Sequence, residues 1–459
     1  MKSRRISRNT NSSGRATNRR SFLAGSAGLG LAALTGPTTL MALNKGVQAD
    51  GEPIPIGGAM PLTGWGAGDG LETRRGLEMA AEEINAVGGI HGRPLEIHIE
   101  DTKDMGADLV IQALQRLIDR YGTHAIINGY NAGTLTVEYD TIADAGIIYM
   151  HQNTDIVHHK TVGDDPEKYF GVFMGDPAEY WYGAGFVEFL HNLEKSGQWK
   201  RRNNRIAMIS GSDNNGVTVA NAMKEAIKNS DYGFEISIHE VIVPPISEWG
   251  PTLEKIRADD SSIINMVHWF PQDGAQFMLQ FTKNPTDSIV YMRYGPSLQA
   301  FRDIGGEAVV GVTYSSVVAA LQDTIGLHFA KNYRAKFGED STPMVGSETY
   351  DMCWHYALAA AMAGGTGEPG DFDQNRRISK NLRYLIYRGV QGVTRYWRDP
   401  PEDPWPFQAA IPYPDATNDP SLGMAHQFYQ IQDLAKPPTV IAPWPYETGG
   451  FETPRWFKG

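Results

Sequence analysis

Apolar patterns typical of strands and of helices alternate along most of this 459-residue chain. Leu95, Ile97 and Ile99 alternate with polar residues, as in a half-buried strand. Before them, residues 77–84 repeat apolar side chains at helical spacing, and Gly88-Gly89 ends that helix. Such alternation predicts βαβ units, and therefore α/β architecture with mostly parallel sheets covered by helices on both faces.

The alternation occurs in two successive runs, and the second begins after about residue 175. The other predicted strands are 54–60, 124–127, 147–150, 204–210, 235–243, 263–267, 289–292 and a final one at 427–432. The other predicted helices are 110–118, 219–227 and an apolar, Ala-rich one at 346–363. A single hydrophobic core does not grow to this size, so we expect two α/β lobes.

Charge and cysteine content exclude several classes of protein. The net charge is −12, although residues 1–49 carry eight basic residues and no acidic one, so the rest of the chain is more acidic than the whole. An acidic body repels nucleic acid and anionic lipid, so no nucleic-acid partner is expected. The only cysteine, Cys353, excludes intrachain disulfides and cysteine-based zinc sites.

The basic N-terminal segment resembles a twin-arginine export signal. Asn18-Arg-Arg-Ser-Phe-Leu23 precedes a mild apolar run at 24–43, and small residues at 47–49 are followed by Asp50. We expect residues 1–49 to be cleaved after about Ala49, which places the mature protein in the periplasm. The alternatives are a basic disordered terminus or a membrane anchor. No later segment approaches 18 uninterrupted apolar residues, so no direct membrane insertion is expected.

A glycine-rich stretch, PLTGWGAGDG at 61–70, lies between the first predicted strand and its helix. Its glycines fall at every second position, which does not fit the G-x-G-x-x-G loop of dinucleotide binders, and no Gly-Lys-Ser/Thr follows. No cofactor is therefore expected. Thr63 and Trp65 remain as candidates at the carboxyl end of the strand, where open α/β sheets bind ligands.

Motifs for catalysis and metal binding are absent from the sequence. It has no G-x-S-x-G outside the leader and no H-E-x-x-H, and residues 371–382 lack the glycine and glutamate of a calcium loop. We interpret His151, His158 and His159 as part of a solvated loop rather than as metal ligands. No catalytic residue and no metal site are predicted.

Loops that combine polar and aromatic residues follow several predicted strands. They are 128–134, 151–155, 212–216, 268–271 and 293–295. Loops at the carboxyl ends of parallel strands share one edge of a sheet, so two such edges facing each other would form a cleft. Aromatic walls with a few hydrogen-bonding groups suit a small organic solute.

The segment 57–64, GGAMPLTG, and the segment 76–95, GLEMAAEEINAVGGIHGRPL, resemble the leucine/isoleucine/valine-binding protein family. These proteins are the solute-binding components of ATP-driven importers. The resemblance covers roughly residues 52–395. It implies a type I periplasmic binding fold, in which two Rossmann-like lobes are joined by three crossings and close on the solute like a hinge.

By this resemblance the crossings fall near 173–176, 314–317 and 389–394. Lobe one would then comprise 50–174 and 316–390. Lobe two would comprise 175–315 and 391–459, the latter with a Pro-rich C-terminal extension at 399–420.

The resemblance also implies where the solute binds. Amino-acid binders of this family hold the ligand carboxylate on lobe one through a Ser and a Thr, but Asp155 stands in place of the Thr. In lobe two, Asn215 replaces a Tyr, and Tyr294 lies where an acid usually pairs with the ligand ammonium. These departures argue against an unmodified α-amino acid, and the aromatic residues of the loops favour a flatter or more apolar solute, such as an amide, a urea-like compound or an aromatic acid. The expected solute is therefore an amino acid or amino-acid-like molecule, an amide or urea-type compound, or an aromatic compound. The expected ligand-binding residues are Thr63, Trp65, Tyr130, Asn131, Ala132, Asn153, Thr154, Asp155, Asn215, Trp269, Phe270 and Tyr294.

Three functions are compatible with these patterns. The first is a solute-binding protein without catalytic activity that delivers a small molecule to an ABC permease. The second is a sensor with the same fold that docks onto a receptor. The third is an exported enzyme, because twin-arginine substrates often carry cofactors.

Overall fold

A computed structural model describes residues 49–132, 134–396, 408–410, 412–413 and 423–458. The chain separates into residues 1–48 and a second unit, Ala49–Gly459, to which all that follows refers. The twin-arginine motif, and most of the Pro-rich stretch 399–420, lie outside the described residues.

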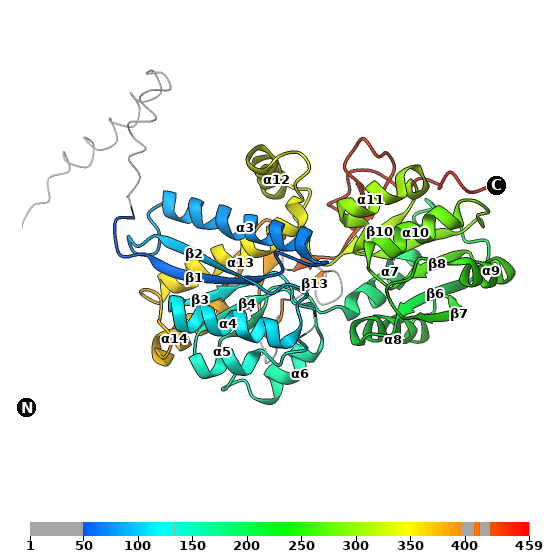
Figure 1. Ribbon diagram of the computed structural model, residues 1–459. Helices are drawn as coiled ribbons and strands as arrows, with labels where there is room; N and C mark the ends of the chain where they lie inside the picture. Colours follow the sequence, from blue (N-terminus) through cyan, green and yellow to red (C-terminus); the bar gives the residue numbers. More distant parts are fainter. Residues whose placement is uncertain (1–48, 133, 397–407, 411, 414–422, 459) are drawn as a thin grey trace, which may run out of the picture. The chain divides into compact units, whose positions relative to one another are not determined.

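Residues 54–174 of this unit contain a five-stranded parallel sheet with the order β2-β1-β3-β4-β5 (Figure 1). Its strands are β1 (Ile54–Met60), β2 (Leu95–Asp101), β3 (Ala125–Ile127), β4 (Ile148–His151) and β5 (Val172–Met174). Successive side chains of a strand point to opposite faces. Thus Ala125 and Ile127 join the core beneath one layer of helices, and Ile126 joins the core beneath the other.

Helices cover both faces of this sheet, and we call the sheet and its helices lobe one. The first layer contains α3 (Ala67–Ala86), α13 (Pro343–Met362) and α14 (Phe372–Tyr384), whose apolar sides share a core with β1. The second contains α4 (Ala107–Tyr121) and α5 (Tyr139–Ala145). The helix α6 (Val157–Asp164) follows β4, and α12 (Thr324–Phe337) precedes α13. The glycine-rich stretch 61–70 is only partly a loop, because α3 begins inside it.

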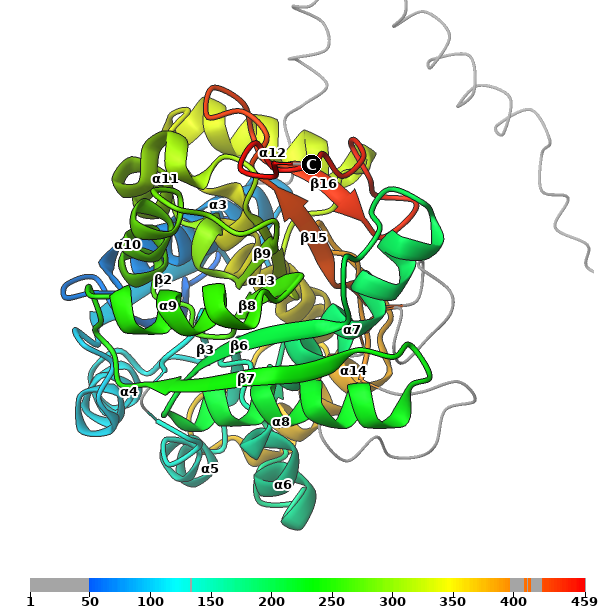
Figure 2. The ribbon, with the colours of Figure 1, turned by 90° about the vertical axis from the view of Figure 1, so that its right-hand side faces the viewer.

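A seven-stranded sheet with the order β16-β15-β10-β9-β8-β6-β7 forms the basis of lobe two (Figure 2). The strands β6 (Arg205–Gly211), β7 (Glu235–Ile242), β8 (Ile263–Met266), β9 (Ile289–Arg293) and β10 (Thr313–Ser316) are parallel. Two antiparallel strands, β15 (Gln427–Gln430) and β16 (Thr439–Ala442), complete one edge. The C-terminal part of the chain therefore pairs with β10.

The helices of lobe two also lie on both faces of its sheet. One core contains residues of α7 (Tyr180–Lys195) and α8 (Asn214–Asn229). The opposite core contains residues of α9 (Gly250–Asp259), α10 (Pro271–Phe281) and α11 (Gln299–Gly305). Short 3-10 turns, η2 (Gly295–Ser297) and η3 (Gly306–Val309), flank α11. The predicted α/β class with mostly parallel sheets is confirmed.

A short hairpin, β11 (Tyr387–Arg388) and β12 (Val393–Thr394), lies near one predicted crossing. The buried carboxylate of Asp351 on α13 accepts hydrogen bonds from the backbone N–H groups of Val390 (2.9 Å) and Gln391 (2.8 Å), which fixes the hairpin turn. A further short pair, β13 (Pro412–Tyr413) and β14 (Met424–Ala425), is parallel. The lobe boundaries and crossings stated above stay predictions. Among the described residues, no helix is both long and apolar enough to cross a membrane.

Candidate functional site

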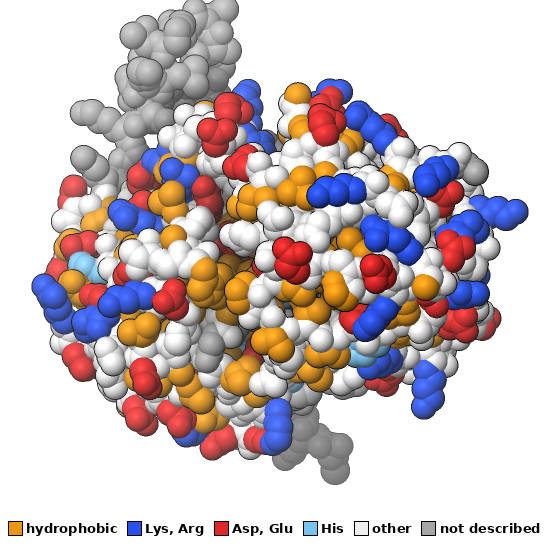
Figure 3. Space-filling view, turned by 45° about the vertical axis from the view of Figure 1, so that its right-hand side comes forward, with side chains coloured by type: hydrophobic (Ala, Val, Ile, Leu, Met, Phe, Trp, Pro, Cys, Tyr) orange, Lys and Arg blue, Asp and Glu red, His pale blue; other side chains and the backbone are white. Residues whose placement is uncertain are grey.

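A cavity of ≈ 660 Å³ lies where loops of both lobes meet. Its walls come from the carboxyl ends of β1, β3, β4, β6, β8 and β9, the region where open α/β sheets bind ligands. This volume falls within the roughly 300–1,000 Å³ typical of small-molecule sites. On the face of the protein in Figure 3, hydrophobic side chains gather along the middle, between areas rich in charged side chains.

All the residues expected to bind ligand line this cavity, except Thr63. Thr63 is exposed, and its hydroxyl donates a 2.6 Å hydrogen bond to Oδ2 of Asp101 at the end of β2. Its side chain therefore supports the loop after β1. The structure brings together the others from six loops, as strand-end placement predicted.

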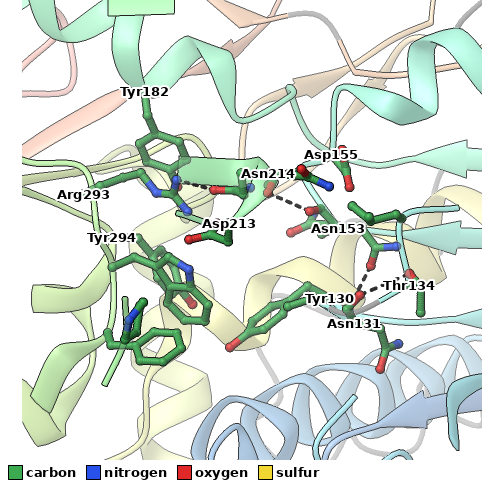
Figure 4. A pocket seen from close by; sticks show the side chains of 18 of the residues that line it. Tyr130, Asn131, Thr134, Asn153, Asp155, Tyr182, Asp213, Asn214, Arg293 and Tyr294 are labelled. Carbon is green, nitrogen blue, oxygen red and sulfur yellow. Dashed lines mark hydrogen bonds between the residues drawn. The ribbon is translucent and has the colours of Figure 1, made fainter. Parts of the chain in front are cut away.

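Two lobe-one loops are joined to each other and to β1 by side-chain amides (Figure 4). The backbone N–H of Asn131 donates to Asn153 Oδ1 at 2.9 Å, and Asn131 Nδ2 donates to the carbonyl of Ala59 at 3.1 Å. Asn153 Nδ2 in turn donates to Glu138 Oε1 at 3.1 Å. Burial raises the pKa of Glu138 to about 7. These bonds fix the amide groups that face the cavity.

Aromatic rings from both lobes contact one another at the cavity. The ring of Trp65 lies 5.4 Å from Trp269 and 5.4 Å from Phe270, measured between centroids. Tyr130 meets Trp269 edge-on at 6.1 Å, and Trp269 lies 6.2 Å from Tyr294. Trp65 is nevertheless 47% exposed. These contacts connect the loops after β1 and β3 to those after β8 and β9.

Asp69, in the first turn of α3, lies behind this aromatic group and links the lobes. Its Oδ2 accepts hydrogen bonds from the hydroxyls of Tyr130 (2.5 Å) and Tyr294 (3.1 Å). Burial raises the pKa of Asp69 to about 6. The sequence analysis did not identify Asp69. An acidic residue within a glycine-rich helix start was the only available signal.

Arg293, the last residue of β9, is the one basic side chain among the described residues of the cavity wall. It is only 5% exposed. Its Nη1 donates to Oδ1 of Asn215, and its guanidinium lies 5.0 Å from the ring centre of Tyr182. Arg293 belongs to the loop 293–295 that was expected at the cleft, but neither Arg293 nor Tyr182 was expected to bind ligand.

Several carboxyl groups near the cavity bond to backbone N–H groups at loop ends and helix starts. Asp213 accepts from the N–H of Gly216 at 2.8 Å and caps α8. Asp155 accepts from Val157 at 3.0 Å, and burial raises its pKa. Glu179 accepts from Ile156 at 2.7 Å, and burial raises its pKa to about 8.

Glu348 on α13 also lines the cavity and lies 1% exposed. Its Oε2 has no hydrogen-bond partner among the described residues. Burial, with Asp69 and Asp176 nearby, raises the pKa of Glu348 well above its ordinary value. Burial and the neighbouring acids therefore favour the protonated form of this carboxyl group.

The prediction that His151, His158 and His159 lie in a solvated loop is wrong for two of the three histidines. His151 and His158 are buried, and the hydroxyl of Tyr139 lies 2.9 Å from Nε2 of His151 and 2.9 Å from Nδ1 of His158. This tyrosine satisfies both rings inside the protein. Within the described part of the chain, no group of three or more His, Cys, Asp or Glu side chains is arranged to hold a metal ion.

Comparisons with known proteins agree on one family. A family model described as periplasmic binding protein matches residues 53–398. A solved structure from Silicibacter pomeroyi, described as a putative branched-chain amino acid ABC transporter, is 48% identical, with a TM-score of 0.83 over 88% of this chain and 100% of that one.

More distant similarities extend over most of the chain. The branched-chain amino acid transporter substrate-binding protein of Streptococcus pneumoniae, solved with isoleucine, is 17% identical with a TM-score of 0.65, covering 85% of this chain and 100% of that one. Leu/Ile/Val-binding protein homolog 7 of Brucella abortus is 25% identical over 332 residues, which are 67% of this chain and 76% of the relative.

Proposed function

This chain belongs to the periplasmic binding protein family, and we propose that it captures a small organic solute between its lobes and delivers it to the membrane permease of an ABC importer. The family resemblance expected from the sequence, and the type I fold that it implies, are confirmed. The relatives named above are described as transporter or amino-acid-binding proteins, which supports transport as the role.

The cavity built jointly by both lobes is the observation that carries this proposal. Its wall includes Tyr130 and Asn153 from lobe one and Asn215 and Trp269 from lobe two. A solute that contacts both lobes stabilises the form in which they are closed, because it binds that form more tightly than the open one. The permease would then recognise the closed form.

We further propose that the protein binds its solute without chemical turnover and acts in the periplasm after twin-arginine export. The family supports binding rather than catalysis, and Arg19-Arg20 in front of an apolar run supports the route. Replacing both arginines with lysine should retain the precursor in the cytoplasm, as fractionation would show. Normal export of that variant would contradict the twin-arginine route.

Thermal-shift screening tests the proposed function directly. Protein freed of solute by unfolding and refolding would be screened against amino acids, amides, ureas and aromatic acids. A true solute should raise the melting temperature progressively as its concentration increases. At a hundred times its Kd, it should add about 2.7 kcal/mol to the free energy of unfolding. A screen in which no compound stabilises the protein, or in which one is consumed, would contradict solute capture.

A further inference from the structure

The guanidinium of Arg293 is a buried positive charge on which the carboxyl groups of Asp213 and Glu179 act only from beyond ion-pair distance. Among the described residues, no carboxylate forms an ion pair with it; its charged end bonds to the neutral amide of Asn215. Its Nε is buried and has no hydrogen-bond partner. A buried, unpaired charge costs several kcal/mol by general estimates, so a protein that retains one on a cavity wall has a use for it.

The position of Arg293 is fixed before any solute arrives. The hydrogen bond to Asn215 and the face of Tyr182 hold the guanidinium plane at the end of β9. Figure 4 shows Arg293 and Tyr182 on the same side of the cavity as Asp213 and Asn214, with Tyr130 and Asn153 across from them. The start of α8, at Asn214, adds the positive end of a 16-residue helix to the same wall.

The acidic groups described around the cavity form no salt bridge with this charge, although Asp213 and Glu179 attract it and thereby oppose the lowering of the Arg293 pKa by burial. Asp213 and Asp155 each bond to a backbone N–H at the start of a helix, and Asp104 is exposed at the edge. Asp69 lies between two tyrosine hydroxyls. Glu348 is 1% exposed beside Asp69 and Asp176, which favours its protonated form.

We propose that the solute is an organic carboxylate, that Arg293 of lobe two binds its anionic group, and that its apolar or aromatic body lies against Tyr130, Trp269 and Tyr294. This inference rests on the proposed function. It reverses the arrangement that the resemblance implies, in which lobe one holds the carboxylate and an acid of lobe two holds the ammonium. Asp155, which occupies a carboxylate-binding position of lobe one in that arrangement, would repel the anion there.

An arginine suits this role because its planar fork can donate two parallel hydrogen bonds to one carboxylate. The aromatic rings provide apolar surface beside the charge, as in most small-molecule sites. An α-ammonium group is not required by any of these contacts. Carboxylates that lack one should therefore bind as well as amino acids of the same shape.

Three pairs of probes test the proposal by calorimetric titration: 4-methylpentanoate and 4-methylpentanamide, L-leucine and L-leucinamide, and benzoate and benzamide. In each pair that binds, the acid should bind at least about tenfold more tightly than the amide, the loss expected when a charge-assisted pair is removed. Arg293→Met should abolish this preference. Arg205→Met, at the opposite end of the same sheet, should preserve it.

The outcomes separate this inference from the proposed function. If amides bind as tightly as acids, or if Arg293→Met keeps the affinity for acids, the carboxylate inference fails while solute capture stands. If neither the acids nor the amides bind the wild-type protein, the carboxylate inference also fails. The thermal-shift screen described above then decides whether the proposed capture of a solute stands. Should Arg293→Met not fold, Arg293→Lys decides: weaker binding of acids alone supports the inference, and unchanged binding of acids contradicts it.

Discussion

The hydroxyl of Tyr294, just after β9, donates a 3.1 Å hydrogen bond to Asp69 in the first turn of α3. The two residues lie 225 positions apart in sequence, and their bond connects lobe two to lobe one. The same carboxylate oxygen accepts from Tyr130 of lobe one. Asp69 is thus held by one tyrosine from each lobe. In the proposed open form the lobes would separate and this bond would be lost, so we expect it to stabilise the closed form.

Tyr294→Phe should weaken solute binding without unfolding either lobe. Loss of one hydrogen bond to a carboxylate costs about 1.5–3 kcal/mol, and because closure and binding are coupled we expect the Kd to rise roughly tenfold or more. Titration calorimetry would measure it. Tyr232→Phe removes a hydroxyl that bonds Glu188 within lobe two, and it should leave the Kd unchanged. Equal affinities of wild type and Tyr294→Phe would show that the hydrogen bond between Tyr294 and Asp69 does not contribute to closure.

Trp65→Ala should lower affinity much more than it lowers the melting temperature of the solute-free protein. The ring is half exposed yet contacts Trp269 and Phe270 of the other lobe, so it contributes to closure rather than to a core. Truncating an aromatic contact residue of this kind costs about 2 kcal/mol of binding, roughly thirtyfold in Kd. Trp444→Ala, at a 71% exposed tryptophan outside the cavity wall, is the matched control. A large melting shift with unchanged affinity would assign Trp65 a structural role.

Asp155→Thr should tighten the binding of a carboxylate probe. The change removes a negative charge from the cavity wall, and the threonine hydroxyl can still accept from the Val157 N–H. At an effective dielectric constant of about 20, such a charge repels an anion by on the order of 1 kcal/mol or more, so the Kd should fall at least about fivefold. Asp155→Asn should have the same effect, because it removes the same charge. Unchanged or weaker binding in both variants would refute this prediction.

The free energy of unfolding should fall as the pH rises from about 7 to about 9. Burial raises the pKa of Glu138 to about 7 and of Glu179 to about 8, so the folded protein keeps these protons to a higher pH than the unfolded chain does. Raising the pH ionises them in the folded state and removes that stabilisation. Burial lowers the pKa values of His151, His355 and His426, so these histidines affect the free energy of unfolding only at lower pH. There the unfolded chain takes up protons before the folded protein does, and stability falls as the pH is lowered.

Calorimetric melting temperatures across this pH range would test the effect. Glu179→Gln keeps an oxygen that can accept from Ile156 and should flatten the profile, whereas Glu225→Gln, exposed on α8, should not. A melting temperature that is constant or rises toward pH 9 would contradict the assignment.

Gly76→Ala should destabilise lobe one because α3 and α13 touch at this point. A Cβ at Gly76 would lie 1.9 Å from the carbonyl oxygen of Gly346, so the helices must separate, at a cost of about 1–3 kcal/mol or more. Gly68→Ala in the same helix meets no atom within 4 Å and should be neutral or slightly stabilising. Chemical denaturation would measure both; equal stabilities would contradict this packing.

The architecture was predictable because hydrophobic periodicity is a local property of the sequence. The helix expected at 346–363 is α13 (Pro343–Met362), and the strand expected at 289–292 is β9 (Ile289–Arg293). The strand β16 was missed because it has four residues and follows a Pro-Pro pair, which masks a strand pattern. Short helices such as α5 lack enough turns to show a period.

The site was only partly predictable, for a physical reason. Aromatic and amide residues after strands are unusual enough to be noticed, and this identified Trp65, Asn153 and Trp269. Arg293 and Asp69 were not named as ligand-binding residues because a single charged residue in a sequence is normally solvent-exposed. These two residues are buried because loops from two lobes that are distant in sequence pack together there. A local sequence pattern cannot predict such long-range packing.

Capture between two lobes is the central claim, and small-angle X-ray scattering tests it most directly. Solute-free protein would be measured alone and with the probe that gives the largest thermal shift, at a concentration that saturates binding. The account predicts that the wild-type protein has a smaller radius of gyration with the saturating probe than without it. The Tyr294→Phe variant should keep its solute-free radius of gyration at probe concentrations well below the Kd of that variant. Superimposable profiles of the wild-type protein with and without a saturating probe would contradict it.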